Sequence, residues 1–276
     1  MNLERELAAA LAVAERAGQF IRAEYESFTP IPNAPSDIST HVDKGSQDII
    51  LKFLHEAFPH DGLCAEEDTA TPQTAAANAP ARMWVVDPID GTRGFAMKNG
   101  EFSTMIGLTV DRVPVLGVVL EPTTMTYTYA ALGGGCWTKI GERGAPARCR
   151  VRNAAQAGSC VLVQSRPSKK NSPTKAQLAL QPERTLEMYS AGVKLAVVAR
   201  GEADVYVNTY PNFRDWDICA GHILVTEAGG SVTGLRGEPL TYGEDGFVQR
   251  RGLVASVAGI HAAVVERLRA TPTDPV

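Results

Sequence analysis

The sequence predicts a two-part protein of mixed α+β and α/β class, with an antiparallel N-terminal sheet and two helices before a smaller C-terminal α/β part. Two amphipathic helical patterns precede several β-rich segments, which indicates a layer of helices packed on one sheet. Beyond residue 152, short apolar runs alternate with helical segments, as in an α/β layer. The segment 141–152 is rich in glycine, arginine and alanine, so we expect domains at residues 1–148 and 149–276.

The two N-terminal helices follow from the spacing of apolar residues. From Leu3 to Ile21 these residues recur at steps of three and four with charged residues between them, which predicts an amphipathic helix through about Tyr25. Residues 28–39 contain three prolines and are expected to form a loop. A second helix then presents an apolar face up to residue 57, and Asp43 stands where it begins, as an N-cap would.

A run of acids after this helix has two interpretations. Residues 63–65 are apolar, and residues 66–68 read Glu-Glu-Asp. Adjacent acids usually form a solvated loop. The segment 69–81, rich in alanine, threonine and proline, is long enough to let them fold back beside the next strand, and Glu66 is then a candidate metal ligand.

That next strand leads into two aspartates. Residues 83–86 are apolar and predict a buried strand, which we expect to end at Asp87-Pro88 because proline cannot continue a central ladder. Asp90 follows through a proline-fixed turn, so the two carboxylates converge and repel each other unless a hard cation such as Mg²⁺ lies between them. Gly91 permits a tight turn, and Gly-Thr at a helix start directs free N–H groups at an anion. This combination indicates phosphate chemistry, although Asp, Pro and Gly are also ordinary turn formers.

The remaining sheet strands are read from β-rich segments. Residues 102–110 and 113–120 are joined by Asp111-Arg112, a hairpin connection. Residues 125–132 continue the meander, and we expect the three glycines at 133–135 to end it.

The C-terminal part is read from alternating short strands and apolar helices. Strands are expected at 161–163, 205–207 and 253–257, and helices at 191–199, 217–228 and 260–269.

A second acidic motif lies at the start of one of these helices. Residues 214–221 read Arg-Asp-Trp-Asp-Ile-Cys-Ala-Gly, which places Asp217 in the first helical turn. A favourable interaction with the helix dipole would explain this position. The alternative is a carboxylate that completes a metal site between the domains, where small ligands commonly bind.

Composition excludes several classes of function. The formal net charge of -4 and the lack of a basic cluster argue against a nucleic-acid polymer as partner. Scattered cysteines, no signal-peptide pattern and no apolar stretch near the ~20 residues of a membrane span indicate a cytoplasmic protein without such a span. The five histidines share no spacing that would hold a metal, and no nucleophile elbow or nucleotide-binding P-loop is present.

Taken together, these motifs resemble the inositol monophosphatase superfamily of metal-dependent, lithium-sensitive phosphatases. The resemblance extends over almost the whole chain and rests on Glu-Glu at 66–67, Asp-Pro-Ile-Asp-Gly-Thr at 87–92, Trp-Asp-Ile-Cys-Ala-Gly at 216–221 and Glu-Ala-Gly-Gly at 227–230. It implies a layered α/β sandwich, usually a homodimer, that hydrolyses phosphate esters with a water that Mg²⁺ activates.

The resemblance also implies the role of individual residues. The implied Mg²⁺ ligands are the side chains of Glu66, Asp87, Asp90 and Asp217 and the backbone carbonyl of Ile89. Thr-His-Val-Asp at 40–43 resembles the family's Thr-x-x-Asp, so the implied catalytic residues are Asp43 and Thr92, which orient the attacking water, together with Glu67. Gly91 and Thr92 would hold the phosphate through backbone N–H groups.

Within the superfamily, the segments 99–102 and 190–195 resemble bacterial 3'(2'),5'-bisphosphate nucleotidases. Lys194 gives a second phosphate a cationic partner, and Arg93 and Ser190 join it, with Asp217, as expected substrate contacts. Tyr189 departs from the nucleotidases, which usually have glycine there.

The expected reaction is conversion of adenosine 3',5'-bisphosphate to AMP and phosphate. The alternatives are a phosphatase for inositol 1-phosphate or another small monophosphate such as histidinol phosphate, and a non-catalytic phosphate-binding relative. In the first alternative, Lys194 merely lies on a solvated helix face.

Overall fold

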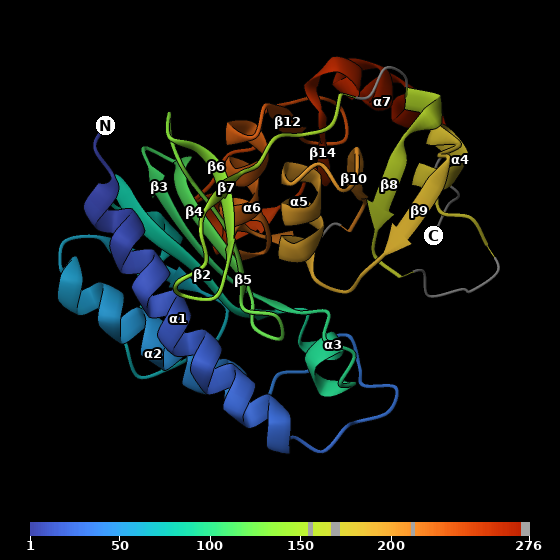
Figure 1. Cartoon of the computed structure of the whole chain (residues 1–276). Helices are drawn as coiled ribbons and strands as arrows, with labels where there is room; N and C mark the ends of the chain where they lie inside the picture. The colour runs from blue at the N-terminus through green and yellow to red at the C-terminus, as the bar shows by residue number, and fades with distance from the viewer. Residues whose placement is uncertain (154–156, 167–171, 211–212, 272–276) are drawn as a thin grey trace.

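The computed structural model describes residues 1–153, 157–166, 172–210 and 213–271, which fold into alternating layers of helices and sheets. Helices α1 (Glu4–Ser27) and α2 (His41–Ala57) cover one face of a seven-stranded sheet, and α5 (Ala191–Ala199) and α6 (Asp215–Glu227) cover the other, as Figure 1 shows. A five-stranded sheet packs on the far side of α5 and α6. Helices α4 (Lys175–Leu180) and α7 (Ala258–Ala270) form the outermost layer.

The seven-stranded sheet follows chain order and is antiparallel except where its first strand pairs in parallel with the second. Its strands are β1 (Gly62–Ala65), β2 (Arg82–Asp90), β3 (Ser103–Val110), β4 (Val113–Glu121), β5 (Thr126–Ala131), β6 (Gly135–Ile140) and β7 (Ala147–Arg148). Along β2, Met83 and Val85 enter the core shared with α5 and α6, whereas Trp84 and Val86 enter the core beneath α1 and α2. The alternation buries both faces of the strand.

The smaller sheet has the order β12-β14-β10-β8-β9, and a two-stranded ribbon pairs β11 with β13. These strands are β8 (Val161–Gln164), β9 (Arg184–Glu187), β10 (Val205–Asn208), β11 (Phe213–Arg214), β12 (Gly230–Thr233), β13 (Val248–Gln249) and β14 (Leu253–Val257). A five-residue helix, α3 (Thr92–Ala96), and the 3₁₀ turns η1 (Ala76–Asn78), η2 (Ala157–Ser159) and η3 (Asp245–Phe247) complete the described elements.

Most predicted elements are confirmed, and three local predictions are wrong. Strand β2 does not stop at Pro88 but continues to Asp90, because a register shift between Asp87 and Asp90 removes the proline from the regular ladder. The glycines at 133–135 do not end the meander: Gly133 and Gly135 have positive φ and turn the chain into β6. Asp43 is not an N-cap, since Thr40 caps α2 and Asp43, the third residue of the helix, is its partner in the capping box.

Helix α6 lies very close to the seven-stranded sheet because two strand residues have no side chain. A Cβ on Gly117 would stand 2.2 Å from the carbonyl oxygen of Ala220, and one on Gly107 would stand 2.7 Å from Cys219 Sγ. This close packing sets the position of the α6 N-terminus, and hence of Asp217, relative to the sheet.

The domain boundary between residues 148 and 149 stays a prediction. No helix among the described residues is both long and apolar enough to cross a membrane. All five cysteines are buried and free.

Candidate active site

Three carboxylates meet where β2 ends and α6 begins. Asp87, Asp90 and Asp217 each place one oxygen within 4.8 Å of the other two. The register shift in β2 brings the first two together, and the short distance between α6 and the sheet supplies the third. The structure thus joins the two acidic motifs that lie far apart in the sequence.

Burial makes this cluster costly to charge. Asp87 is only 2% exposed, and its pKa is raised well above the usual value, first by burial and then by Glu66, Asp90 and Asp217. Burial also raises the pKa of Asp217 to about 7, against the backbone N–H of Arg214, which lowers it. Asp87 Oδ1 is buried without a hydrogen-bond partner within the described ranges. The carboxylate oxygens have too few hydrogen-bond donors to balance their negative charge, and a hard divalent cation would supply the missing positive charge.

Glu66 lies beside this cluster but outside the tight group of three. It directly follows β1, which pairs with β2, so it comes next to the β2 aspartates as predicted. Although its surface is exposed, the surrounding protein raises its pKa to about 8, with Asp217 and Asp43 adding to the effect. The Glu66 side chain is thus open to solvent on one side and surrounded by protein and like charge on the other, which suits a ligand at the rim of a metal site.

Asp43 and Thr92 form a hydrogen-bonded pair. Thr92 Oγ1 lies 2.8 Å from Asp43 Oδ1 and 2.9 Å from the carbonyl oxygen of Ile89. The other Asp43 oxygen accepts hydrogen bonds from Thr40 N at 2.9 Å and Thr40 Oγ1 at 2.6 Å. Asp43 is fully buried, and burial raises its pKa despite these bonds. A hydroxyl with two acceptors and a single hydrogen keeps a lone pair for a water.

The turn at Gly91 connects the carboxylates to α3. Gly91 has φ +87°, and a Cβ there would stand 2.9 Å from the carbonyl oxygen of Glu101 and 3.2 Å from Ser190 N. Both the conformation and the space therefore require glycine. Helix α3 begins at Thr92, so the first N–H groups of the helix point toward the carboxylate end of β2.

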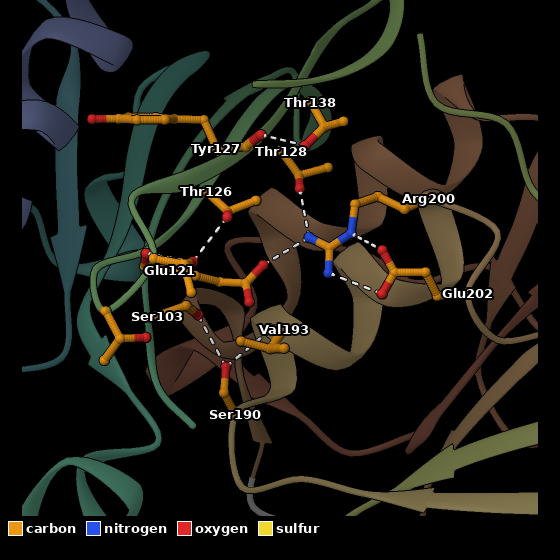
Figure 2. Close-up of polar contacts among 12 residues, drawn as sticks. Ser103, Glu121, Thr126, Tyr127, Thr128, Thr138, Ser190, Val193, Arg200 and Glu202 are labelled. Atoms are coloured by element: carbon orange, nitrogen blue, oxygen red, sulfur yellow. Dashed lines mark hydrogen bonds and ion pairs between the residues drawn. The ribbon is translucent and has the colours of Figure 1, made fainter. Parts of the chain in front are cut away.

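Asp90 is held in place by the start of α5. Its Oδ2 accepts hydrogen bonds from Gly192 N at 2.6 Å, from Ser103 Oγ at 3.4 Å and from Ser190 Oγ. Figure 2 shows Ser103 and Ser190 pointing toward each other, with their hydroxyl oxygens 3.0 Å apart. Ser190 also accepts a hydrogen bond from Val193 N at 3.0 Å and so caps α5.

Three predicted site residues have protein partners of their own. Lys194 is 1% exposed, and its ammonium donates to Ser165 Oγ at 3.2 Å, to Met188 O at 3.2 Å and to Tyr189 O at 3.0 Å. It does not lie on a solvated helix face, and burial lowers its pKa to about 8.

The Glu67 carboxylate accepts a hydrogen bond from Ser39 Oγ at 2.6 Å. The Gln47 side chain donates to the Glu67 carbonyl oxygen and accepts a hydrogen bond from its N–H. Arg93 places its guanidinium 5.5 Å from the centre of the Tyr189 ring.

Several residues near the site have no motif that would have revealed them. Ser103 binds Asp90, and Gln47 fixes the loop that carries Glu67. Arg166 lies over the Tyr189 ring beside Arg93, at 5.3 Å from the ring centre. Each acts through a partner far away in sequence, so spacing along the chain carries no signal for it.

A surface cavity of about 520 Å³ lies away from these carboxylates, next to Arg200 and the β5–β6 hairpin. Arg200 Nη1 donates to Glu121 Oε1 at 2.7 Å and Thr128 Oγ1 at 3.0 Å, and its Nε donates to Glu202 Oε1 at 2.6 Å, as Figure 2 shows. Because these charges are already matched inside the protein, we assign the chemistry to the carboxylate cluster and not to this cavity.

Both the sequence and the structure of the chain are similar to those of known proteins. The model of a family described as "Inositol monophosphatase family" matches residues 2–270. The 3'(2'),5'-bisphosphate nucleotidase CysQ of Escherichia coli strain K12 is 31% identical over 233 residues, covering 83% of this chain and 91% of that protein. The inositol-1-monophosphatase of Bacillus subtilis strain 168 is 24% identical over 255 residues, covering 92% of each. The solved inositol monophosphatase from Anabaena (Nostoc) sp. PCC 7120 superposes with a TM-score of 0.80 at 25% identity, covering 99% of this chain and 98% of that one. This superposition confirms the layered α/β sandwich.

Proposed function

The chain belongs to the inositol monophosphatase family, and from that premise we propose that it is a Mg²⁺-dependent phosphomonoesterase that removes the 3'-phosphate of adenosine 3',5'-bisphosphate. Phosphatase activity follows from the family, while the metal and the substrate are the proposal. The observation that carries it is the group of three carboxylates, the buried Asp87 and Asp90 and the half-buried Asp217, beside the Gly91–Thr92 turn. A site that leaves negative charge unpaired beside free N–H groups suits a cation and a phosphate together.

The donor set favours Mg²⁺ over softer metals. The proposed ligands are the three aspartates, Glu66 and the carbonyl oxygen of Ile89, all of them oxygen donors. When bound, Mg²⁺ supplies positive charge to the phosphate and makes a bound water more acidic.

The protein's own groups position the reactants. The Thr92 hydroxyl, held by Asp43 and the Ile89 carbonyl, presents its lone pair to the attacking water and orients it. The N–H groups of Gly91 and Thr92 hold phosphate oxygens, and Asp217 approaches the substrate from α6. Glu67, joined to Ser39, adds negative charge near Asp43 and Glu66. Phosphoryl chemistry depends mainly on such positioning and charge.

The nucleotide part of the proposal is supported by similarity to the E. coli nucleotidase at 31% identity and by positive charge around Ser190. Arg93 and Lys194 both lie near this residue, which itself holds Asp90. The test is phosphate release from adenosine 3',5'-bisphosphate, inositol 1-phosphate and histidinol phosphate, each with Mg²⁺ and with EDTA. We expect the bisphosphate to have the highest kcat/KM and EDTA to abolish turnover.

A phosphatase for inositol 1-phosphate or another small monophosphate is the second candidate. The observation in its favour is that the three hydrogens of the Lys194 ammonium all have acceptors within the protein. A higher kcat/KM for inositol 1-phosphate than for the nucleotide would establish this candidate instead.

Lithium inhibition, a homodimer and a cytoplasmic location belong to the same proposal and rest on family resemblance and on the sequence. Li⁺ is a small hard cation and would compete with Mg²⁺, so millimolar LiCl should slow turnover. Sedimentation at micromolar concentration should show twice the 29.5 kDa mass of the chain.

A further inference from the structure

Lys194 has no hydrogen left for a ligand. It is 1% exposed and donates to three oxygens, which is the number of hydrogens an ammonium carries. Two of its acceptors are the backbone carbonyls of Met188 and Tyr189, so its charge fixes the chain that enters α5. A second phosphate on the substrate therefore needs another direct partner.

Two arginine side chains lie over the ring of Tyr189. The guanidinium carbons of Arg93 and Arg166 lie 5.5 Å and 5.3 Å from the centre of its ring. Such cation–π contacts hold arginine side chains in position without using their N–H donors. Tyr189 is itself fixed by its N–H bond to Glu101 Oε2 at 3.2 Å and by its hydroxyl, 3.8 Å from Met97 Sδ.

The charges of the two arginines are matched to different degrees. Glu101 pairs with Arg166, whose Nε is 3.3 Å from Glu101 Oε2. Arg93 makes no ion pair within the described part of the chain, and its Nε is buried there without a hydrogen-bond partner. Arg93 therefore keeps hydrogen-bond donors for an anion, while Arg166 lies near the carboxylates of Glu101 and Glu187.

The group adjoins the phosphate turn. Arg93 directly follows Thr92, and Ser190, the neighbour of Tyr189, has its backbone nitrogen 3.2 Å from where a Gly91 Cβ would be. An ester whose first phosphate lies at Gly91 would therefore carry its remaining groups past these arginines.

We propose that Arg93, Arg166 and Tyr189 form a second anion subsite, which binds the phosphate that is not cleaved. The inference rests on the proposed function and names the residues that select a bisphosphate. The arginines donate hydrogen bonds to the anion, and the Tyr189 ring holds their guanidinium groups in position. Lys194, which is bonded to the Tyr189 carbonyl, contributes positive charge without a direct bond to the anion. Glu101 occupies Arg166 in the free protein, and the incoming phosphate replaces it.

The test compares adenosine 3',5'-bisphosphate with adenosine 3'-monophosphate, which lacks only the second phosphate. In Arg93→Ala and Arg166→Ala, the ratio of kcat/KM for the two substrates should fall roughly tenfold for each lost charged contact. Tyr189→Leu should lower the ratio as well. Glu101→Gln removes the competing charge but keeps an oxygen for the Tyr189 N–H, so it should lower KM for the bisphosphate.

Arg251→Ala is the matched control. Its side chain is 40% exposed, as is that of Arg166, and it likewise pairs with one glutamate, Glu244. The ratio should not change in this variant. An unchanged ratio in both Arg93→Ala and Arg166→Ala would overturn the subsite.

A binding measurement separates this subsite from the proposed function. With EDTA present to remove metal, calorimetry should show that adenosine 5'-monophosphate binds to the wild-type protein more tightly than adenosine does, and that Arg166→Ala loses the difference. If the wild type hydrolyses no nucleotide but shows this difference, the proposed substrate fails and the subsite stands. Equal binding of both ligands by the wild type would overturn the subsite, whichever ester is hydrolysed.

Discussion

Two clusters of largely buried charge contrast within the same molecule. Around Arg200, unlike charges meet: the guanidinium bonds Glu121, Glu202 and Thr128, and its side chain is 11% exposed. At the end of β2, like charges meet: Asp87, Asp90 and Asp217 crowd together, and Asp87 keeps a buried oxygen without a partner among the described residues. The first cluster is complete as a protein structure, and the second would be completed by the proposed cation.

The degree of charge matching distinguishes a structural network from a functional one. Both clusters link the seven-stranded sheet to the α5–α6 layer, so location alone does not distinguish them. Matched charge stabilises the fold, whereas unmatched buried charge reduces stability unless a ligand compensates it. Changes in the carboxylate cluster should therefore affect activity and metal response, and changes in the Arg200 cluster should affect stability.

The largest effect is expected from Asp90→Asn. The neutral amide cannot balance a divalent cation, so phosphatase kcat should fall roughly a hundredfold or more at saturating Mg²⁺. The fold should remain, because the amide oxygen still accepts a hydrogen bond from Gly192 N. Steady-state phosphate release and a thermal melt check both parts. A variant that retains more than a few per cent of wild-type kcat would contradict the metal assignment.

Arg200→Met tests the opposite cluster. Removing one partner of a largely buried ion pair leaves Glu121, whose side chain is 19% exposed, without its charge partner. We expect a loss of about 2–3 kcal/mol in the free energy of unfolding, or roughly 5–10 °C in Tm. Activity per folded molecule at 25 °C should not change. A loss of kcat without a loss of stability would mean that the two clusters are not separate.

The contrast was only partly predictable from the sequence. Asp87, Asp90 and Asp217 stand in short motifs whose residue types themselves indicate a metal and a phosphate. Helices such as α1 and strands such as β3 follow from the period of their apolar residues. These signals lie within short segments of the sequence, so they can be recognised without knowledge of the fold.

The remaining features depend on partners that are distant in sequence. The bulge at Pro88 depends on Ser103 as the strand partner of Asp90, and the turn at Gly133 is fixed by hydrogen bonds to the Glu227 carboxylate. Lys194 resembles a ligand contact in sequence, but the fold surrounds it with carbonyl groups. Such positions are set by packing between layers, which no periodicity along one segment describes.

The pH dependence of stability should differ with and without metal. Burial raises the folded-state pKa of Asp217 to about 7 and of Glu66 to about 8, so the folded protein binds protons more tightly than the unfolded chain does. This contribution is fully present below the unfolded-state pKa near 4 and is lost as pH rises through the folded-state values. In EDTA, Tm should therefore fall between about pH 5 and pH 8.

Adding Mg²⁺ should oppose that fall, because the cation stabilises the ionised carboxylates. The rise in Tm on adding Mg²⁺ should grow with pH over the same interval, and Asp90→Asn should lose most of it. Differential scanning fluorimetry at several pH values measures both effects. A metal-induced rise that is greatest at pH 5 would contradict the raised pKa values.

The smallest effect is expected from Ser103→Ala, paired with Thr128→Val as its control. Ser103 Oγ lies 3.4 Å from Asp90 Oδ2, the longest of the three bonds to that oxygen, and Asp90 keeps Ser190 and Gly192. We expect kcat to fall by no more than about fivefold with Tm nearly unchanged, since one weak neutral hydrogen bond contributes less than ~1 kcal/mol. Thr128→Val removes an acceptor 3.0 Å from Arg200 and should lower stability by about 1 kcal/mol without changing kcat. Kinetics and denaturant titration of both variants measure these effects, and a hundredfold loss of kcat in Ser103→Ala would contradict the minor role of this hydrogen bond in positioning Asp90.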